Sequence, residues 1–239
     1  LAPYTLSNFE KVLLEETLLD NVAQRLGLGE PSLDRAMFEQ PYENGLTPPF
    51  FLYVHVLAPH PPFDVDPQGR HVAPAGGSSG LRDGSHFTKD EPGRRRIYRD
   101  GYVDKLTFTN ELVLRYAKRL VERVPDPKLI IIHGDHGGGL HFDQDSVERS
   151  CLFERFSPLL AVYSSDGRLE LPPDLNLTNL YRLVFNTYLD TNLELLPSRS
   201  VFAGWKEPAR QIVLTPEQLH RPCRTEATVL DGVSAAQPR

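Results

Sequence analysis

The amino-acid sequence predicts an α/β fold with a mainly parallel sheet and helices on both of its faces. Two short, nearly continuous apolar runs, residues 50–57 and 128–133, are typical of strands buried on both sides. Segments with helical spacing of their apolar residues precede, separate and follow these runs, and this alternation indicates helices packed on a sheet. With 239 residues, of which 40% are hydrophobic, the chain is long enough for one domain with a sizeable core.

The first helix is expected over residues 5–27, where apolar residues recur at steps of three and four. Ser7 and Glu10 have the spacing of a capping box at its start, and Gly27 supplies a stop. Residues 30–49 contain several prolines and are expected to be connecting chain.

The strand at 50–57 is followed by a long segment rich in Gly, Pro, Asp and Arg, residues 64–96. A stretch of about 30 residues without periodicity is unusual in a compact domain, so we expect a functional or mobile loop. Within it, Arg94–Arg96 are expected in a solvated loop, with contact to an anionic headgroup as the alternative. A second helix is predicted over residues 97–124 and ends at Pro125.

The clearest buried strand, residues 128–133, leads into a glycine-rich turn, and a further strand is predicted over residues 158–163. Thr178 is expected to cap a third helix. Periodicity is lost from about residue 215, so the predicted organisation is one domain over residues 1–214 and an irregular tail over residues 215–239.

The composition excludes several classes of protein. A net charge of −6 and a pI near 5.8 argue against a dedicated nucleic-acid binder, whose surface would be basic. No apolar run reaches the roughly 18–20 residues that cross a bilayer. The chain begins at Leu1 without a signal-peptide pattern, which leads us to expect an excised product. Cys151 and Cys223 match no metal or redox spacing, and whether they pair stays open.

The first candidate site is the turn after residues 128–133. Ligands of open α/β sheets bind beyond the carboxyl ends of the strands, which is where Asp135 and His136 stand. A neighbouring carboxylate and imidazole can bind one divalent cation if the backbone turns sharply, as the flanking glycines allow. His141 could extend this metal site. The alternative is a polar turn with a capping aspartate, a solvated histidine and a solvated acidic loop.

The second candidate site lies at the end of the other apolar run and contains His55 and His60. Imidazole can ligate a metal, contact a phosphoryl or sulfuryl oxygen, or act as a general acid. His60 lies between prolines in a rigid loop and is the better candidate for such a contact. His55 lies inside the apolar run, where a core histidine bonded to a neighbour is the alternative.

Two motifs of the chain resemble motifs of the alkaline phosphatase-like superfamily. The first is LYVHVLAPHPPF, residues 52–63, and the second is IIHGDHG, residues 131–137. Residues 154–156 and the order of the later elements are also similar. Within the superfamily, the resemblance is to the sulfatase-like and phosphoethanolamine- or phosphoglycerol-transferase-like membrane enzymes of bacteria, over about residues 5–205.

This resemblance implies a role for each candidate residue. Asp135 and His136 would ligate a divalent metal, which is Zn, Mn, Mg or Ca and would polarise the ester and lower the pKa of the nucleophile. His60 would contact the phosphate or sulfate of the substrate, and His55 matches an upstream histidine of the same unit. The substrate would be a phosphate or sulfate ester, with a lipid headgroup or a glycan as the carrier.

The chain departs from the family at the nucleophile. In the family, a Thr, Ser or modified Cys and another acidic ligand come from the amino-terminal half of the fold, and Cys151 lacks the sequence context of such a nucleophile. We therefore expect the carboxyl-terminal part of a larger enzyme, incomplete at its N-terminus and inactive alone. A membrane anchor upstream would hold that enzyme at the extracytoplasmic face of a bacterial membrane.

Three hypotheses about function follow. The first is a fragment of a metal-dependent sulfatase-like hydrolase or transferase that acts on phosphate or sulfate esters. The second is a degenerate, non-catalytic family member that binds an anionic glycan or lipid. The third is an unrelated metallohydrolase that uses the cluster after residues 128–133 on its own, namely His133, Asp135, His136 and His141.

Overall fold

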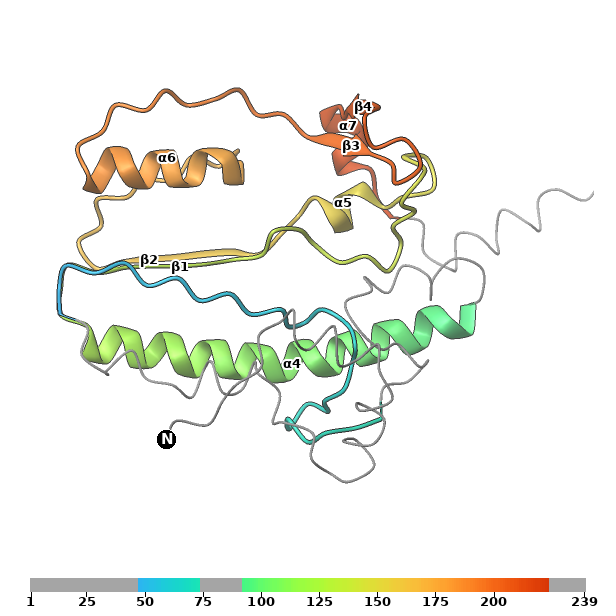
Figure 1. Ribbon diagram of the computed structural model, residues 1–239, viewed down its shortest axis with the longest axis horizontal. Coiled ribbons are helices and arrows are strands. Elements are labelled where there is room, and N and C mark those ends of the chain that lie inside the picture. Colours follow the sequence, from blue (N-terminus) through green and yellow to red (C-terminus); the bar gives the residue numbers. More distant parts are fainter. Residues whose placement is uncertain (1–46, 74–91, 224–239) are drawn as a thin grey trace, which may run out of the picture. The chain divides into compact units, whose positions relative to one another are not determined.

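The computed structural model describes residues 47–73 and 92–223, so the helix expected at residues 5–27 lies outside the described residues. The chain divides into two compact units, Leu1–Glu122 and Arg123–Arg239, and each is described here by itself. Figure 1 labels the helices and strands of both units. None of the helices within the described ranges is both long and apolar enough to cross a membrane.

The first unit is built on one long helix, α4, which spans Pro92–Arg123 (Figure 1). The helix predicted over residues 97–124 is therefore confirmed, but it begins five residues earlier. The expectation that Arg94–Arg96 lie in a loop was wrong, because these residues form the start of α4. Arginine has a high helix propensity, so a run of three extends the helix into the predicted loop.

The residues after His60 pack against α4 and form the core of the first unit. Val65, Phe108 and Leu112 are buried together, and Val56 and Tyr116 pack against them. The chain reverses over residues 64–72, where Val65 forms an isolated antiparallel bridge with His71. The segment expected to be a long unstructured loop thus begins with an ordered turn.

The run at residues 50–57 was predicted to be a buried strand, and this prediction was wrong. These residues form no strand with any described part of the chain, and the side chain of Phe51 is 82% exposed. Of the run, Val56 packs against the core of the unit. A strand exists only when another segment supplies hydrogen-bonding partners, and apolar composition does not itself provide that segment.

The second unit contains the two strands predicted after α4. β1 spans Leu129–His133 and β2 spans Leu160–Ser164, so both predictions are confirmed within two residues. The strands pair antiparallel, with Leu129 opposite Ser164 and His133 opposite Leu160. The expected mainly parallel sheet is not found among the described residues, whose strand pairs are both antiparallel. Apolar runs indicate burial, but they do not encode the direction of the neighbouring strand.

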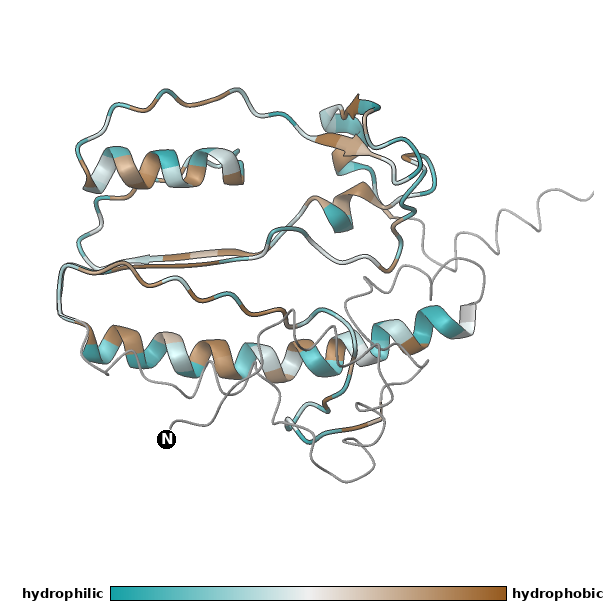
Figure 2. Cartoon of the chain, viewed as in Figure 1, coloured by the Kyte–Doolittle hydropathy of each residue, from teal (hydrophilic) through white to brown (hydrophobic). Residues whose placement is uncertain are grey.

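Helix α6, Leu177–Tyr188, is tied to both ends of the β1–β2 pair. Tyr181 contacts His133 at the end of β1, and the hydroxyl of Tyr188 lies 2.7 Å from that of Ser164 at the end of β2. The helix therefore runs antiparallel to β1. Figure 2 shows apolar and polar residues on different sides of α6, as expected for a helix with one packed face.

The N-cap of α6 is Asn176, and the prediction of Thr178 was wrong. The side chain of Asn176 accepts a hydrogen bond of 3.0 Å from the backbone N–H of Asn179, which is the bond that defines an N-cap. Thr178 lies two residues later, inside the first turn. Both residue types are good caps, so the side chain that meets the free N–H decides between them.

Among its described residues, the second unit also contains a small subcluster around α5, Leu152–Arg155, and a hairpin of β3, Val201–Ala203, and β4, Gln211–Val213. Its core residues are Val147, Leu152, Phe202 and Leu214. The start of the predicted irregular tail is helical, because α7 spans Pro216–His220. Thr215 and Gln218 form a capping box that starts this helix, and a capping box satisfies two backbone N–H groups at once.

The question of cysteine pairing is answered by the second unit. Cys151, the N-cap of α5, forms a disulfide with Cys223, which follows α7. The two cysteines are 72 positions apart in sequence, and α5 and α7 contact each other in the structure. Cys151 and Cys223 are the only cysteines of the chain, so neither is a free thiol.

Candidate functional site

The turn that follows β1 places Asp135 and His136 side by side and open to solvent. Oδ2 of Asp135 lies 3.7 Å from Nε2 of His136, and Oδ1 accepts a 3.0 Å hydrogen bond from the His136 backbone N–H. The Asp135 side chain is 89% exposed and that of His136 is 42% exposed. Two ligand atoms on one tetrahedral zinc ion lie about 3.3 Å apart, given metal–ligand distances near 2.0–2.1 Å. A small movement would therefore bring both atoms onto one cation.

The hydrogen bond made by the His136 ring leaves Nε2, the nitrogen that faces Asp135, available to a metal. Its Nδ1 lies 2.9 Å from the carbonyl oxygen of Gly137. A carbonyl oxygen accepts only, so Nδ1 carries the proton and Nε2 keeps its lone pair. A histidine ligand commonly donates its other N–H in this way. The donor set of one carboxylate and one neutral imidazole fits a hard or borderline divalent cation.

His133, at the end of β1, is already occupied on both ring nitrogens. Nδ1 lies 3.1 Å from the carbonyl oxygen of Gly134, and Nε2 lies 2.9 Å from the hydroxyl of Tyr181. With Nδ1 donating to the carbonyl, the tyrosine hydroxyl donates to Nε2. In this arrangement His133 holds α6 against the end of β1 and offers no free lone pair to a metal.

The glycine turn owes its shape to close packing against α5. The backbone N–H of Gly137 donates to the carbonyl oxygen of Arg155 at 2.8 Å. A Cβ atom at position 137 would overlap the carbonyl oxygen of Glu154, so only glycine fits here. The short helix α5 therefore supports the loop that carries Asp135 and His136.

His141, expected as an extension of the metal site, has a different partner in the structure. Its Nδ1 lies 2.9 Å from Oε2 of Glu154, whose other oxygen accepts a 2.7 Å hydrogen bond from the backbone N–H of Leu140. The pair is partly buried. The sequence analysis included Glu154 only among the residues that resemble the family. Its bonds to Leu140 and His141 were not predicted, because these partners lie 14 and 13 positions away. The role of His141 as a metal ligand stays a prediction.

The second candidate site, around His60, lies in the first unit. The backbone N–H of His60 donates to the carbonyl oxygen of Leu57 at 2.8 Å and closes a turn, and its ring is partly buried. Nδ1 lies 2.6 Å from the carbonyl oxygen of Pro61, so this nitrogen is the protonated one and Nε2 remains to face a ligand. His55 is exposed, with its ring 6.2 Å from that of Tyr53, so it is not a core histidine.

Lys105 of α4 anchors the loop that carries His60. Its ammonium group donates to the carbonyl oxygen of Pro62 at 2.9 Å and to Oδ1 of Asp64 at 3.1 Å. The side chain of Lys105 is only 9% exposed, and that of Asp64 is 24% exposed. Between these contacts, the buried ring of Phe63 packs edge-on against Tyr98 with centroids 5.0 Å apart. The residues just after His60 are thus held on both sides of Phe63.

The sequence analysis did not single out Lys105, although a signal was present. Lys105 belongs to a stripe with alternating spacings of four and three on α4: Tyr98, Tyr102, Lys105, Thr109 and Leu112. A side chain at such a position faces the core of the unit whatever its type. A lysine in an otherwise core-facing stripe indicates a buried ionic partner, which here is Asp64.

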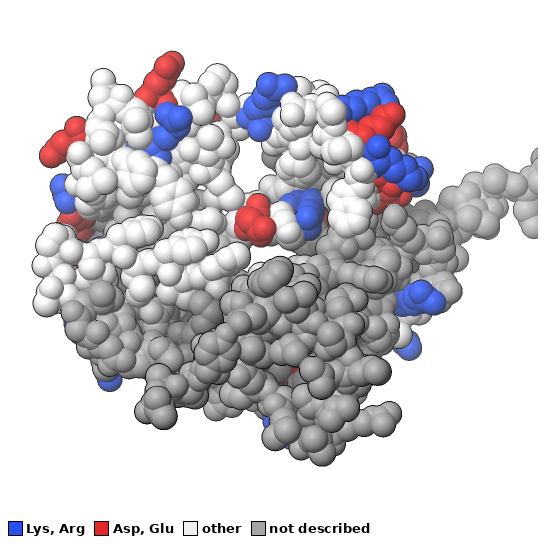
Figure 3. Space-filling view, in the orientation of Figure 1, with Lys and Arg blue, Asp and Glu red and all other residues white. Residues whose placement is uncertain are grey.

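The charges on the visible surface are of both signs. Figure 3 shows Lys and Arg side chains interspersed with Asp and Glu side chains over the described elements of the second unit. Binding to the phosphate backbone of nucleic acids requires a continuous basic surface. This face of the described residues does not carry one.

Comparison with protein families identifies the chain's relatives. A family model described as Sulfatase matches residues 2–153, which is more than half of the chain and includes His55, His60, Asp135, His136 and His141. No curated protein and no solved structure matches. The match confirms the resemblance to the sulfatase-like branch of the alkaline phosphatase-like superfamily. The chain belongs to the sulfatase family.

Proposed function

We propose that this chain supplies the metal-binding part of a sulfatase-like hydrolase or transferase that acts on phosphate or sulfate esters. The Asp135–His136 pair is the observation that carries the proposal. Both side chains are exposed at the carboxyl end of β1, their ligand atoms lie 3.7 Å apart, and His136 presents the lone pair of Nε2. Membership of the sulfatase family supports the same reaction class and an α/β domain, with the mainly parallel sheet as part of the proposal.

Each candidate residue has a chemical role in this proposal. A divalent cation, when bound, would supply positive charge to the ester oxygens. Asp135 and His136 hold that cation, and the Gly137 contact with α5 keeps their loop in place. His60 presents Nε2 to an oxygen of the phosphate or sulfate group, since Nδ1 is held by the Pro61 carbonyl. Lys105 keeps the His60 loop on α4.

The nucleophile is assigned to a Thr, Ser or modified Cys outside this chain. Cys151 and Cys223 are joined in a disulfide, so neither sulfur is available as a thiolate for attack on an ester. The resemblance to the family is what places that residue, with a further acidic metal ligand, in the amino-terminal half of the fold. On this proposal the 239-residue chain binds metal but turns over no ester.

The disulfide also supports a location. Disulfides persist in oxidising compartments, so Cys151–Cys223 favours such a compartment. The proposal places the chain on the extracytoplasmic side of a bacterial membrane, as the family resemblance implies. The proposed substrate there is a phosphate or sulfate ester on a lipid headgroup or a glycan. Attachment to the membrane would come from a region that precedes this chain in the larger enzyme.

Calorimetric titration of the oxidised chain with Mn²⁺ and with Zn²⁺ tests the metal site. We expect one cation per chain, with affinity reduced at least tenfold by His136→Ala or Asp135→Asn, because each change removes one ligand. His60→Ala should leave metal affinity unchanged. His220→Ala is the matched control, since His220 is an exposed histidine of α7 whose Nδ1 is bonded to the Pro216 carbonyl.

Turnover is measured in the larger protein with an aryl sulfate and an aryl phosphate as substrates. His136→Ala should lose metal and turnover together, whereas His60→Ala should lose turnover with metal retained. Unchanged turnover in His60→Ala would contradict the assignment of the oxyanion contact. Metal binding without turnover in the larger wild-type protein would favour the alternative, a non-catalytic member that binds an anionic glycan or lipid.

A further inference from the structure

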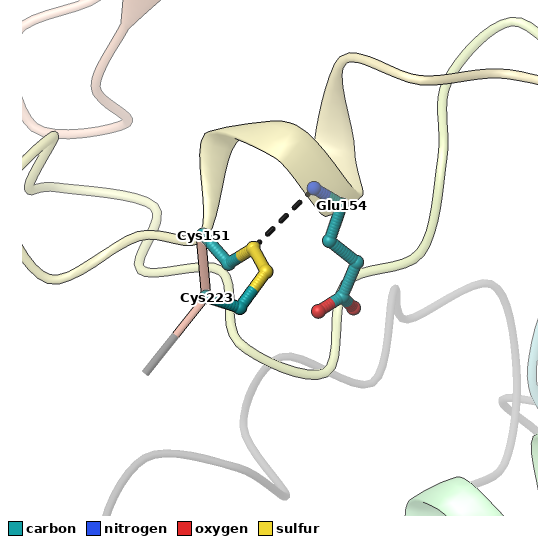
Figure 4. Close-up of side chains that lie close together, drawn as sticks. All are labelled: Cys151, Glu154 and Cys223. Atoms are coloured by element: carbon teal, nitrogen blue, oxygen red, sulfur yellow. Dashed lines mark hydrogen bonds between the residues drawn. A yellow bond between two sulfur atoms is a disulfide. The ribbon is translucent and has the colours of Figure 1, made fainter. Parts of the chain in front are cut away.

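A second group of potential metal ligands lies away from the Asp135–His136 pair, around α5. It consists of Cys151, Glu154 and Cys223, and Figure 4 shows their side chains turned toward one another. One ligand atom of each lies within 4.8 Å of the ligand atoms of the other two. Cys151 is buried, and Glu154 and Cys223 are partly buried. The two sulfurs are joined in a disulfide, so in this state they are not metal ligands.

The carboxylate of this group is already oriented by its neighbours. Oε1 of Glu154 accepts a 2.7 Å hydrogen bond from the Leu140 N–H, and Oε2 lies 2.9 Å from Nδ1 of His141. Carboxylates that ligate metals are typically held by such outer hydrogen bonds, which reduce the entropy lost when the ion binds. Glu154 and His141 together therefore form a prepared ligand and its support.

The sulfur of Cys151 is also placed to carry negative charge. It accepts a hydrogen bond of 3.3 Å from the Glu154 backbone N–H, and the backbone N–H of Cys151 donates to the His141 carbonyl at 2.6 Å. A hydrogen bond donated to a sulfur favours its thiolate over its thiol. The backbone contacts hold this position independently of the bond between the two sulfurs.

We propose that Cys151, Cys223 and Glu154 form a redox-gated zinc site, which is closed while the disulfide is intact and opens when a dithiol reduces it. The dithiol gives two electrons and two protons, the S–S bond breaks into two thiols, and the dithiol leaves as its cyclic disulfide. Zn²⁺ then binds as the two thiols release two protons. Two thiolates select a soft or borderline cation over Mg²⁺ or Ca²⁺.

The geometry suits an ion with one open coordination position. With Zn–S bonds of about 2.3 Å, two sulfurs on a tetrahedral zinc lie about 3.8 Å apart, so they need only move from bonding to contact distance. The Cα atoms of the two cysteines are 5.0 Å apart, and Glu154 is three residues after Cys151 on the same short helix. Three protein ligands leave the fourth position to water. This site does not depend on the function proposed above.

The test measures zinc in the Asp135→Asn/His136→Ala double variant of the chain, which lacks both ligands of the first metal site. One sample is kept oxidised, and another is reduced with dithiothreitol and freed of it by anaerobic gel filtration. Competition with a chromophoric chelator should show one zinc ion per chain in the reduced sample and none in the oxidised sample. Co²⁺ in place of zinc should give a sulfur-to-cobalt charge-transfer absorption band only after reduction.

Variants identify the ligands. Cys223→Ser should remove the zinc, Glu154→Gln should weaken its binding at least tenfold, and His141→Ala should weaken it by about 10–100-fold as the loss of a positioning residue. Glu148→Gln, at a nearby carboxylate bonded to Ser146, is the matched control and should bind as tightly as the parent. Far-UV circular dichroism confirms that each sample is folded, and if Cys223→Ser unfolds, Glu154→Gln decides the question.

Three results would overturn the proposal. One is a reduced and folded sample that takes up no more zinc than the oxidised sample. Another is zinc uptake after reduction that Glu154→Gln and Cys223→Ser both leave unchanged, because the ion would then be bound elsewhere. The third is the absence of a charge-transfer band with Co²⁺, which would exclude thiolate ligation.

Discussion

Asp64→Ala should destabilise the chain by about 2 kcal/mol, because it leaves the ammonium group of Lys105 buried without its carboxylate. Removing one partner of a fully buried ion pair costs about 3–5 kcal/mol. The cost is lower here, since Asp64 is 24% exposed and Lys105 keeps its hydrogen bond to the Pro62 carbonyl. The Lys105 side chain is 9% exposed, so water cannot replace the lost carboxylate fully.

Substitution of the other partner, Lys105, should lower the free energy of unfolding by less. Lys105→Met places an apolar side chain of similar length at the same buried position and leaves Asp64 where water can reach it. The loss is then the donor to the Pro62 carbonyl, worth about 1 kcal/mol. The pair therefore predicts an order, with Asp64→Ala more damaging than Lys105→Met, although both delete the same ionic contact.

Urea unfolding followed by far-UV circular dichroism measures both effects, because α4 is the longest described helix and contributes directly to the helical signal. The double variant completes a cycle, whose coupling energy we expect to exceed about 1 kcal/mol. Glu111→Ala on the same helix is the control, since the Glu111–Arg115 pair is exposed and such pairs contribute only about 0.2–1 kcal/mol to the free energy of unfolding. A Lys105→Met variant less stable than Asp64→Ala, or a coupling energy as small as that of an exposed ion pair, would refute this account of the loop.

Three further predictions concern the second unit. Gly137→Ala should weaken metal binding at least tenfold and lower Tm, because its methyl group meets the Glu154 carbonyl. Gly93→Ala, in open space at the start of α4, is the control and should not lower Tm. Leu152→Ala should cost about 3 kcal/mol in urea unfolding, because Leu152 is fully buried in the core of the second unit, and a loss under 1 kcal/mol would contradict that packing. The hydrogen bond from Arg168 lowers the pKa of Asp166, with Ser164 and Tyr188 contributing. A lowered pKa stabilises the fold at pH values above 3.8, the ordinary value for aspartate, and this stabilisation is lost as the pH falls below 3.8. The Tm difference between wild type and Asp166→Asn should therefore be largest near neutral pH and shrink in acid. An equal Tm difference at neutral and at acid pH would show that the ionised carboxylate is not involved.

Local pattern was sufficient where the structure is itself local. The periodicity of α4 and α6 and the apolar runs of β1 and β2 are properties of contiguous residues, and all four were predicted within a few positions. The capping box of α7 was equally visible, as Thr215 and Gln218 have its spacing, but it lies in a segment that otherwise lacks periodicity. The proximity of Asp135 and His136 was predictable for the same reason, because they are neighbours in sequence next to a glycine turn, and their role as metal ligands stays a prediction.

The direction of the strands, the pairing of strands and of cysteines, and the burial of the Lys105–Asp64 ion pair depended on contacts between residues distant in sequence. The run at 50–57 has the composition of a strand but has no partner among the described residues, and the antiparallel pairing of β1 with β2 left no trace in either run. The Lys105–Asp64 pair joins positions 41 apart, and the Cys151–Cys223 disulfide joins positions 72 apart. Rules based on the spacing of neighbouring residues do not predict contacts between positions this far apart in sequence.

The sequence by itself determined the family and pointed to Asp135 and His136 as candidate metal ligands, because both are carried by short motifs whose residue types and spacing are readable without a fold. Only the tertiary structure decided which atoms are free to act. It bonded Nδ1 of His136 to a carbonyl and left Nε2 open, paired His141 with Glu154, and joined the two cysteines in a disulfide. The physical reason is that the availability of a donor or lone pair depends on its nearest partner in space, and folding chooses that partner.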